Sequence, residues 1–150
     1  KLYIDAASGT IGSTQVSQTL LGMSLSVNTG WVAKYAADGA LYFSWAQSTK
    51  PEILLNVTFE HNSSAVAEKD AWIAGTTRLM RLKFEGKALT TAGTFANKTL
   101  IIDLAGRWDS FDPLGETNGN DTIAGTFRAG YDATSAKFAE IKVVNETASY

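Results

Sequence analysis

His61 is the only histidine of the chain, and two serines that could pair with it, Ser63 and Ser64, follow closely. A Ser–His–acid triad also needs an oxyanion hole and a well-placed nucleophile. The Gly-x-Ser-x-Gly turn that exposes the nucleophile in one large class of hydrolases does not occur in the sequence. We therefore interpret His61 as a turn residue that precedes a helix, and we predict that the protein is not an enzyme.

Oxygen-bearing side chains gather between residues 109 and 121, where a hard cation such as calcium could find ligands. The segment departs from the Asp-x-Asp-x-Asp-Gly spacing of a calcium loop, and Asn and Asp are also typical of turns. Its candidate cation ligands are Asp109, Asp112, Glu116 and Asp121. One histidine and no cysteine are too few for a tetrahedral zinc site, so we predict no other metal and no cofactor.

Paired carboxylates for sugar hydrolysis could be drawn from Asp103, Asp109 and Glu116, but nothing in their spacing places them across a cleft. We interpret all three as charges on solvated loops. Several asparagines stand in Asn-x-Ser/Thr sequences, which weakly indicates a secreted protein. They are Asn56, Asn62, Asn97, Asn120 and Asn145.

The composition predicts one globular domain spanning residues 1–150. The chain has 150 residues, 45% of them apolar, which is enough to bury a core, and no Pro-rich or charge-dense linker divides it. The formal net charge of −2 argues against tight binding of nucleic acid, which needs clustered Lys and Arg. No stretch approaches the roughly 18 consecutive apolar residues of a membrane-spanning helix.

Alternation of apolar and polar residues, the pattern of a half-buried strand, recurs along the whole chain. The predicted strands are 2–5, 21–27, 41–45, 53–59, 78–84, 100–104, 122–129 and 139–143. Tight turns and the near absence of helical crossovers favour antiparallel pairing. The predicted fold is therefore mainly β, an antiparallel sandwich or flattened barrel of about eight strands.

One short helix, at about residues 65–75, is predicted on the side of this β-domain. Asn62, Ser63 and Ser64 offer acceptors for its first amides, and Gly75 suits the left-handed residue that ends a helix. The expected stripe buries Trp72 and Ile73 on the sheet and leaves Glu68, Lys69 and Asp70 in solvent.

Aromatic residues are concentrated between Gly30 and Lys50. The Asp38-Gly39 dipeptide predicts a hairpin there, from strands 31–36 and 40–45, because a type I′ turn needs positive φ. These rings are too many for one small domain to cover, and exposed Trp and Tyr often mark protein contacts. We therefore predict an interface with a neighbouring copy of the chain, formed by Trp31, Tyr35, Tyr42 and Trp45.

A pattern of β-strands around one central helix covers most of the chain. The segments that carry it are 20–30, 56–61 leading into 65–75, 78–86, 98–106 and 119–127. In these segments the chain resembles the tail tube (major tail) proteins of long-tailed bacteriophages. Many members of that family are longer than this chain, so it stays open whether the chain is a whole subunit or one domain.

The resemblance implies a structural virion protein, a sandwich-like barrel of two packed sheets that assembles into stacked hexameric rings around a lumen. Its partners would be further copies, other tail proteins, and DNA that crosses the lumen without specific binding, since a mildly acidic wall repels phosphate. It would assemble in the host cytoplasm, reside in the virion tail, and involve no membrane. Loops 30–50 and 117–125 and a terminal arm, 139–150, would reach the neighbouring ring.

An extracellular carbohydrate-binding or adhesive β-sandwich is the alternative. The tryptophans, the Asn-x-Ser/Thr sequences and the Asp-rich loop support it. With Trp72 assigned to the core, a stacking platform would have to come from Trp31, Trp45 and Trp108.

Overall fold

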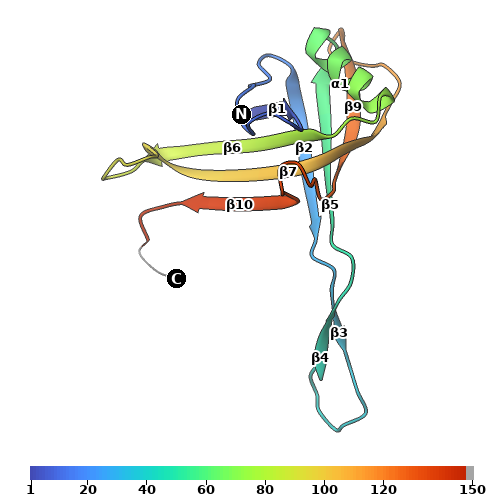
Figure 1. The fold of residues 1–150 in the computed structure, drawn as a ribbon, viewed down its shortest axis with the longest axis vertical. Helices are drawn as coiled ribbons and strands as arrows, with labels where there is room; N and C mark the ends of the chain where they lie inside the picture. Colours follow the sequence, from blue (N-terminus) through green and yellow to red (C-terminus); the bar gives the residue numbers. More distant parts are fainter. Residues whose placement is uncertain (148–150) are drawn as a thin grey trace.

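The computed structural model describes residues 1–147 and confirms a mainly β, antiparallel fold with one short helix (Figure 1). The strands are β1 (Leu2–Ala6), β2 (Leu20–Asn28), β3 (Trp31–Lys34), β4 (Trp45–Ser48), β5 (Glu52–Glu60), β6 (Arg78–Ala88), β7 (Asn97–Phe111), β8 (Gly115–Thr117), β9 (Asn120–Ala129) and β10 (Ala139–Val144). The helix α1 spans Ser63–Ile73.

One long strand, β7, joins two halves of the main sheet. The sheet has the order β1-β6-β7-β9-β5-β2, with β10 also paired to β7 and β8 to β9. The first part of β7 pairs with β6 and β10, and its last part pairs with β9. Figure 1 shows β6, β7 and β10 running across the molecule while β2, β5 and β9 cross them steeply. The result is an orthogonal sandwich rather than a closed barrel.

The core lies between these two halves, and its central ring is Trp108. Along β5 the inward positions alternate as predicted, from Ile53 to Phe59, and are buried. Trp108 meets Phe59 and Phe127 edge-on, with ring centroids 5.9 and 5.5 Å apart. Trp108 is therefore a core residue, and it is not part of the stacking platform that the carbohydrate-binding alternative would need.

The ends of α1 form as the local chemistry predicts. The Asn62 side chain accepts hydrogen bonds from the backbone amides of Ser64 and Ala65 at 3.0 and 3.2 Å. At the other end Gly75 has φ +63°, and its amide and that of Thr76 donate to the last carbonyls of the helix. This is the Schellman arrangement, and it ends the helix at Ile73, two residues before the predicted boundary.

The predicted buried stripe of α1 is wrong in part. Ala65, Glu68 and Ala71 face the sheet, Trp72 is only half-buried, and Ile73 is exposed. Small alanines let the helix approach closely, and the Glu68 carboxylate accepts a hydrogen bond from the indole N–H of Trp108 at 2.9 Å. A buried indole N–H needs such an acceptor, which explains why the polar Glu68 lies on the buried side of the helix.

The interpretation of three carboxylates as charges on solvated loops is wrong in part, because all three lie in strands and one of them is buried. Asp103, interpreted as a solvated loop charge, lies fully buried within β7 and forms a two-point ion pair with Arg81 at 2.7 Å. The hydrogen bonds that the Arg81 guanidinium donates to the Asp103 carboxylate raise the pKa of Arg81. Asp109 and Glu116, likewise interpreted as loop charges, belong to β7 and β8.

The expected strand at 41–45 does not form. Residues 35–44 make an irregular loop, and β3 pairs instead with Trp45–Ser48. The side chains of residues 41–45 are all exposed, so the alternation of this segment has no buried face to stabilise a strand. Gly39 keeps the positive φ, +82°, that its place in the Asp38-Gly39 dipeptide predicted.

The expected terminal arm, 139–150, is folded back over most of its length. Residues 139–144 form β10, paired to β7, and the Glu146 carboxylate binds the Thr90 amide and the Lys98 ammonium. Both partners lower the pKa of Glu146, to about 2, and Lys98 has the largest effect. Residues 148–150 lie outside the described part of the chain. The other predicted contact loop, 117–125, is mostly the start of β9 after a tight Asn118-Gly119 turn.

Candidate functional site

The β3–β4 hairpin projects beyond the ends of β2 and β5, away from the rest of the molecule (Figure 1). Within residues 1–147, its two strands pair only with each other and form a sheet of their own. At the neck, the amide and hydroxyl of Thr49 both donate to the Gly30 carbonyl at 2.6 Å. Gly30 has φ +74°, and a Cβ there would meet the Thr49 carbonyl at 2.7 Å, so only glycine fits this close approach.

A polar clasp shapes the outer part of the hairpin. The Ser44 hydroxyl donates to one oxygen of the Asp38 carboxylate at 2.7 Å, and the Ala40 amide donates to the other at 3.1 Å. These hydrogen bonds lower the pKa of Asp38, and the one from Ser44 has the largest effect. The clasp closes the loop with backbone and small polar groups, which leaves the large side chains around it free to point outward.

The hairpin carries an apolar surface that its own domain does not cover. We define this hairpin surface by its exposed large apolar residues, which are Trp31, Val32, Tyr35, Leu41, Tyr42, Phe43 and Trp45. Tyr42 is 75% exposed and Leu41 is 99% exposed. No charged residue occurs from 39 to 49. A monomer rarely exposes so many clustered apolar side chains unless they bind something.

The four aromatic residues predicted from the sequence, Trp31, Tyr35, Tyr42 and Trp45, all lie on this projecting element and are exposed. Sequence reasoning missed Leu41 and Phe43. It had assigned them to a strand with one face turned inward, whereas they lie in a loop that has no inner face. The signal that could have found them is the run 40–45, in which apolar residues stand side by side rather than strictly alternating.

The backbone amides of His61 and Ser64 both take part in hydrogen bonds at the start of α1. The His61 amide donates to the Asp121 carbonyl at 2.9 Å, which ties the start of α1 to β9. In the described part of the chain, no hydrogen bond joins the imidazole to Ser63 or Ser64.

The candidate cation ligands are spread over three strands and a loop. The Asp109 carboxylate, in β7, pairs with the Arg128 guanidinium at 2.9 Å. Glu116 and Asp121 face each other directly across β8 and β9, and Asp112 stands in the loop between β7 and β8. Within residues 1–147, no three His, Cys, Asp or Glu side chains come together as a metal site would require.

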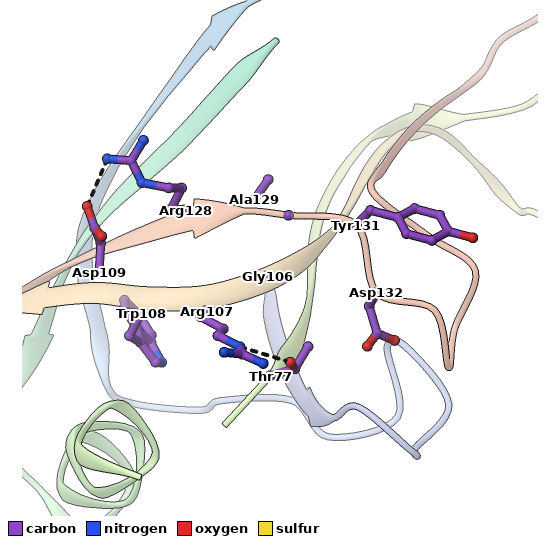
Figure 2. Close-up of a pocket in the computed structure, with 10 residues that line it drawn as sticks. Thr77, Gly106, Arg107, Trp108, Asp109, Arg128, Ala129, Tyr131 and Asp132 are labelled. Atoms are coloured by element: carbon purple, nitrogen blue, oxygen red, sulfur yellow. Dashed lines mark hydrogen bonds and ion pairs between the residues drawn. The ribbon is translucent and has the colours of Figure 1, made fainter. Parts of the chain in front are cut away.

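A shallow hollow of about 440 Å³ lies where β7 and β9 meet the loop that follows β9. Figure 2 shows the Arg128–Asp109 pair on one side and Arg107 directed toward Thr77, with Tyr131 and Asp132 beyond. The Asp132 carboxylate accepts two hydrogen bonds from Ser135 at 2.8 Å, which lower its pKa. The charges of this hollow are thus largely satisfied by neighbours within the chain, in contrast to the bare apolar hairpin surface.

No helix within residues 1–147 combines the length and the apolar character needed to cross a bilayer. No protein-family model matches the chain, and no curated protein is significantly similar to it.

Proposed function

We propose that the protein is a structural subunit that assembles with copies of itself, and specifically a tail tube protein of a long-tailed bacteriophage. The observation that carries the proposal is the hairpin surface: large apolar side chains exposed on an element that projects from a domain with a core of its own. These side chains take no part in the buried core of the domain, and contact with another molecule would remove them from water.

The size of the hairpin surface suits a protein interface. Its five aromatic rings are each more than half exposed. Since an aromatic side chain buries about 150–250 Å², the rings offer on the order of 600 Å², close to the roughly 800 Å² that each partner gives to a standard interface. Residues 39–49 carry no charge, so docking through this part of the hairpin desolvates no ion, as is typical of an interface core.

A conduit for DNA must not hold the DNA. The chain has a net charge of −2, and the outer face of β2, β5 and β9 carries mainly small polar groups such as Ser24, Asn56 and Thr126. A wall of this kind repels or ignores phosphate rather than binding it. In this role the subunit would form stacked hexameric rings, contact other tail proteins, and reside in the tail of a virion assembled in the host cytoplasm.

A carbohydrate-binding module is the second candidate, because Trp31 and Trp45 are both exposed on the hairpin and aromatic faces are common platforms for sugars. It predicts a monomer whose tryptophans contact a glycan. The two candidates therefore predict different oligomeric states. Removal of Trp31 and Trp45 should abolish self-assembly if the first is right and glycan binding if the second is right.

The test is the double variant Trp31→Ser/Trp45→Ser, studied by light scattering after size exclusion and by electron microscopy. We expect the wild type to form rings or tubes and the variant to stay monomeric, with an unchanged far-UV circular dichroism spectrum. The matched control, Leu114→Ser/Tyr131→Ser, removes two apolar side chains that are equally exposed elsewhere and should assemble normally. A monomeric wild type that loses glycan affinity in the double variant would favour the carbohydrate-binding module instead.

A further inference from the structure

A second apolar surface lies on the inner face of β6, β7 and β10, at the end far from the core. The strand register places Leu82, Ile102 and Ile141 in one row across the three strands. Phe84, Leu100 and Val143 form the next row outward. Residues directly opposite each other share a face of the sheet, and Leu82 belongs to the buried core, so both rows are on the inner face.

Side-chain burial decreases along these rows, but the residues stay apolar out to the exposed end. Leu82 is fully buried and Ile102 is half-buried, whereas Phe84, Ile141 and Val143 are exposed, Val143 to 62%. The cause is the orthogonal packing: β6, β7 and β10 extend past the place where β2, β5 and β9 cross them (Figure 1). We define the distal face as Phe84, Leu100, Ile102, Ile141 and Val143; it contains no charged residue.

We propose that the distal face receives the hairpin surface of a second copy of this chain. This inference rests on the proposed function, since it names the two surfaces through which copies would join. It also states that the contact is head to tail, with different surfaces on the two partners.

Three observations favour this occupant. The hairpin of the same chain extends away from β6, β7 and β10, so it leaves its own distal face open (Figure 1). The hairpin surface supplies nearly one partner's share of a standard interface, as estimated above, and needs an apolar surface to receive it. Neither the distal face nor residues 39–49 carry a charge, so their contact would desolvate no ion.

The geometry of the contact has a consequence for assembly. A surface that docks on a copy of itself gives a closed dimer and stops there. Two different surfaces on one chain, joined head to tail, leave one of each free at the ends and generate rings or open filaments. Only the second arrangement lets one hairpin per subunit build an extended structure.

Cross-linking can test the pairing directly, because the chain has no cysteine of its own. Ala40→Cys places a thiol at the hairpin tip, Val143→Cys places one on the distal face, and Ser24→Cys is the control on the exposed outer face of β2. Pairs of single-cysteine proteins are mixed under assembly conditions, treated with a short bismaleimide, and the linked dimers identified by mass spectrometry. We expect the Ala40–Val143 product to exceed the Ala40–Ser24 product by at least about tenfold, because docking raises the effective concentration of the two thiols.

Val143→Glu provides a second readout. It puts a charge on the distal face and should weaken association by about tenfold or more while leaving the melting temperature near that of the wild type. Ser24→Glu adds the same charge on the outer face of β2, away from the distal face, and should leave association unchanged.

The outcomes separate this inference from the proposed function. Oligomers that form without excess Ala40–Val143 linkage, or that link mainly Ala40 to Ala40 or Val143 to Val143, overturn the head-to-tail contact and leave self-assembly intact. A wild type that stays monomeric by light scattering at high concentration overturns both.

Discussion

Trp108 stabilises the centre of the fold through both its ring and its N–H group. The ring contacts Phe59, Phe111 and Phe127, and the N–H donates to the buried Glu68 carboxylate. The Arg78 guanidinium also binds that carboxylate, at 3.2 Å. A buried carboxylate is stable only when such donors surround it, so one tryptophan links the packing of the core to the docking of α1.

The two tryptophans near α1 should therefore differ in their effect on stability. We expect Trp108→Ala to lower the free energy of unfolding by about 3–5 kcal/mol and Trp72→Ala by clearly less, since Trp72 is only half-buried. Trp108→Phe keeps an aromatic ring, though a smaller one, and removes the donor to Glu68; it should cost about 1–3 kcal/mol. Urea denaturation followed by circular dichroism measures all three. Equal losses for the two alanine variants would contradict the burial that the structure assigns to these rings.

At the scale of elements, the loop between β1 and β2 is fixed to the sheet by one side chain. The buried Asp5 carboxylate accepts hydrogen bonds from the backbone amides of Gly12, Ser13 and Thr14 and from the Ser13 hydroxyl, at 2.6 to 3.2 Å. Burial by itself raises the pKa of Asp5, but these hydrogen bonds outweigh it and hold the pKa below the ordinary value of 3.8. The loop then packs Gly12 against Arg81, next to the buried Arg81–Asp103 pair.

The lowered pKa of Asp5 makes the stability of the folded state fall as the pH is lowered. A carboxyl group whose pKa is lowered by folding stabilises the folded state above its unfolded pKa and loses that effect as pH falls through its folded pKa. Asp5→Asn should therefore be less stable than the wild type at pH 7. The gap between the two urea midpoints should narrow as the pH is lowered from about 5 to about 3. A gap that stays constant over that range would show that Asp5 acts through its shape rather than its charge.

At the scale of the whole molecule, the fold divides into a sandwich with one core and a hairpin outside it. The backbone hydrogen bonds of β5 lie between two neighbouring strands, β2 and β9, and its inward side chains are buried. Those of β3 and β4 join two short exposed strands to each other. Local opening costs little free energy where few apolar contacts oppose it. The hairpin should therefore open readily in the monomer and become ordered when a partner binds to it.

Hydrogen exchange can compare the two parts in one sample. In the monomer, amides from 31 to 48 should exchange much faster than those of β5, and on assembly the hairpin amides should become protected while the β5 amides change little. The monomeric Trp31→Ser/Trp45→Ser variant is the control, and its hairpin should remain fast at any concentration. Full protection of the hairpin in the monomer would argue that it is a rigid spike rather than an element ordered by docking.

Local chemistry determined much of this protein from its sequence alone. Period-two alternation predicts most strands because each strand needs only one inward face, and the ends of α1 follow from Asn62 and Gly75 because caps use groups a few residues apart. The aromatic excess between Gly30 and Lys50 predicts an exposed surface because it exceeds what one small core can cover.

Only the tertiary structure decided which surfaces face each other. The roles of Trp108 and Trp72, the burial of Asp103, and the exposure of Ile141 and Val143 all depend on where the two halves of the sheet cross. In sequence, Ile141 and Val143 alternate with charges like any core strand. Burial is a property of pairs of surfaces brought together by non-local pairing, and no local pattern records that the opposite sheet ends before it reaches them.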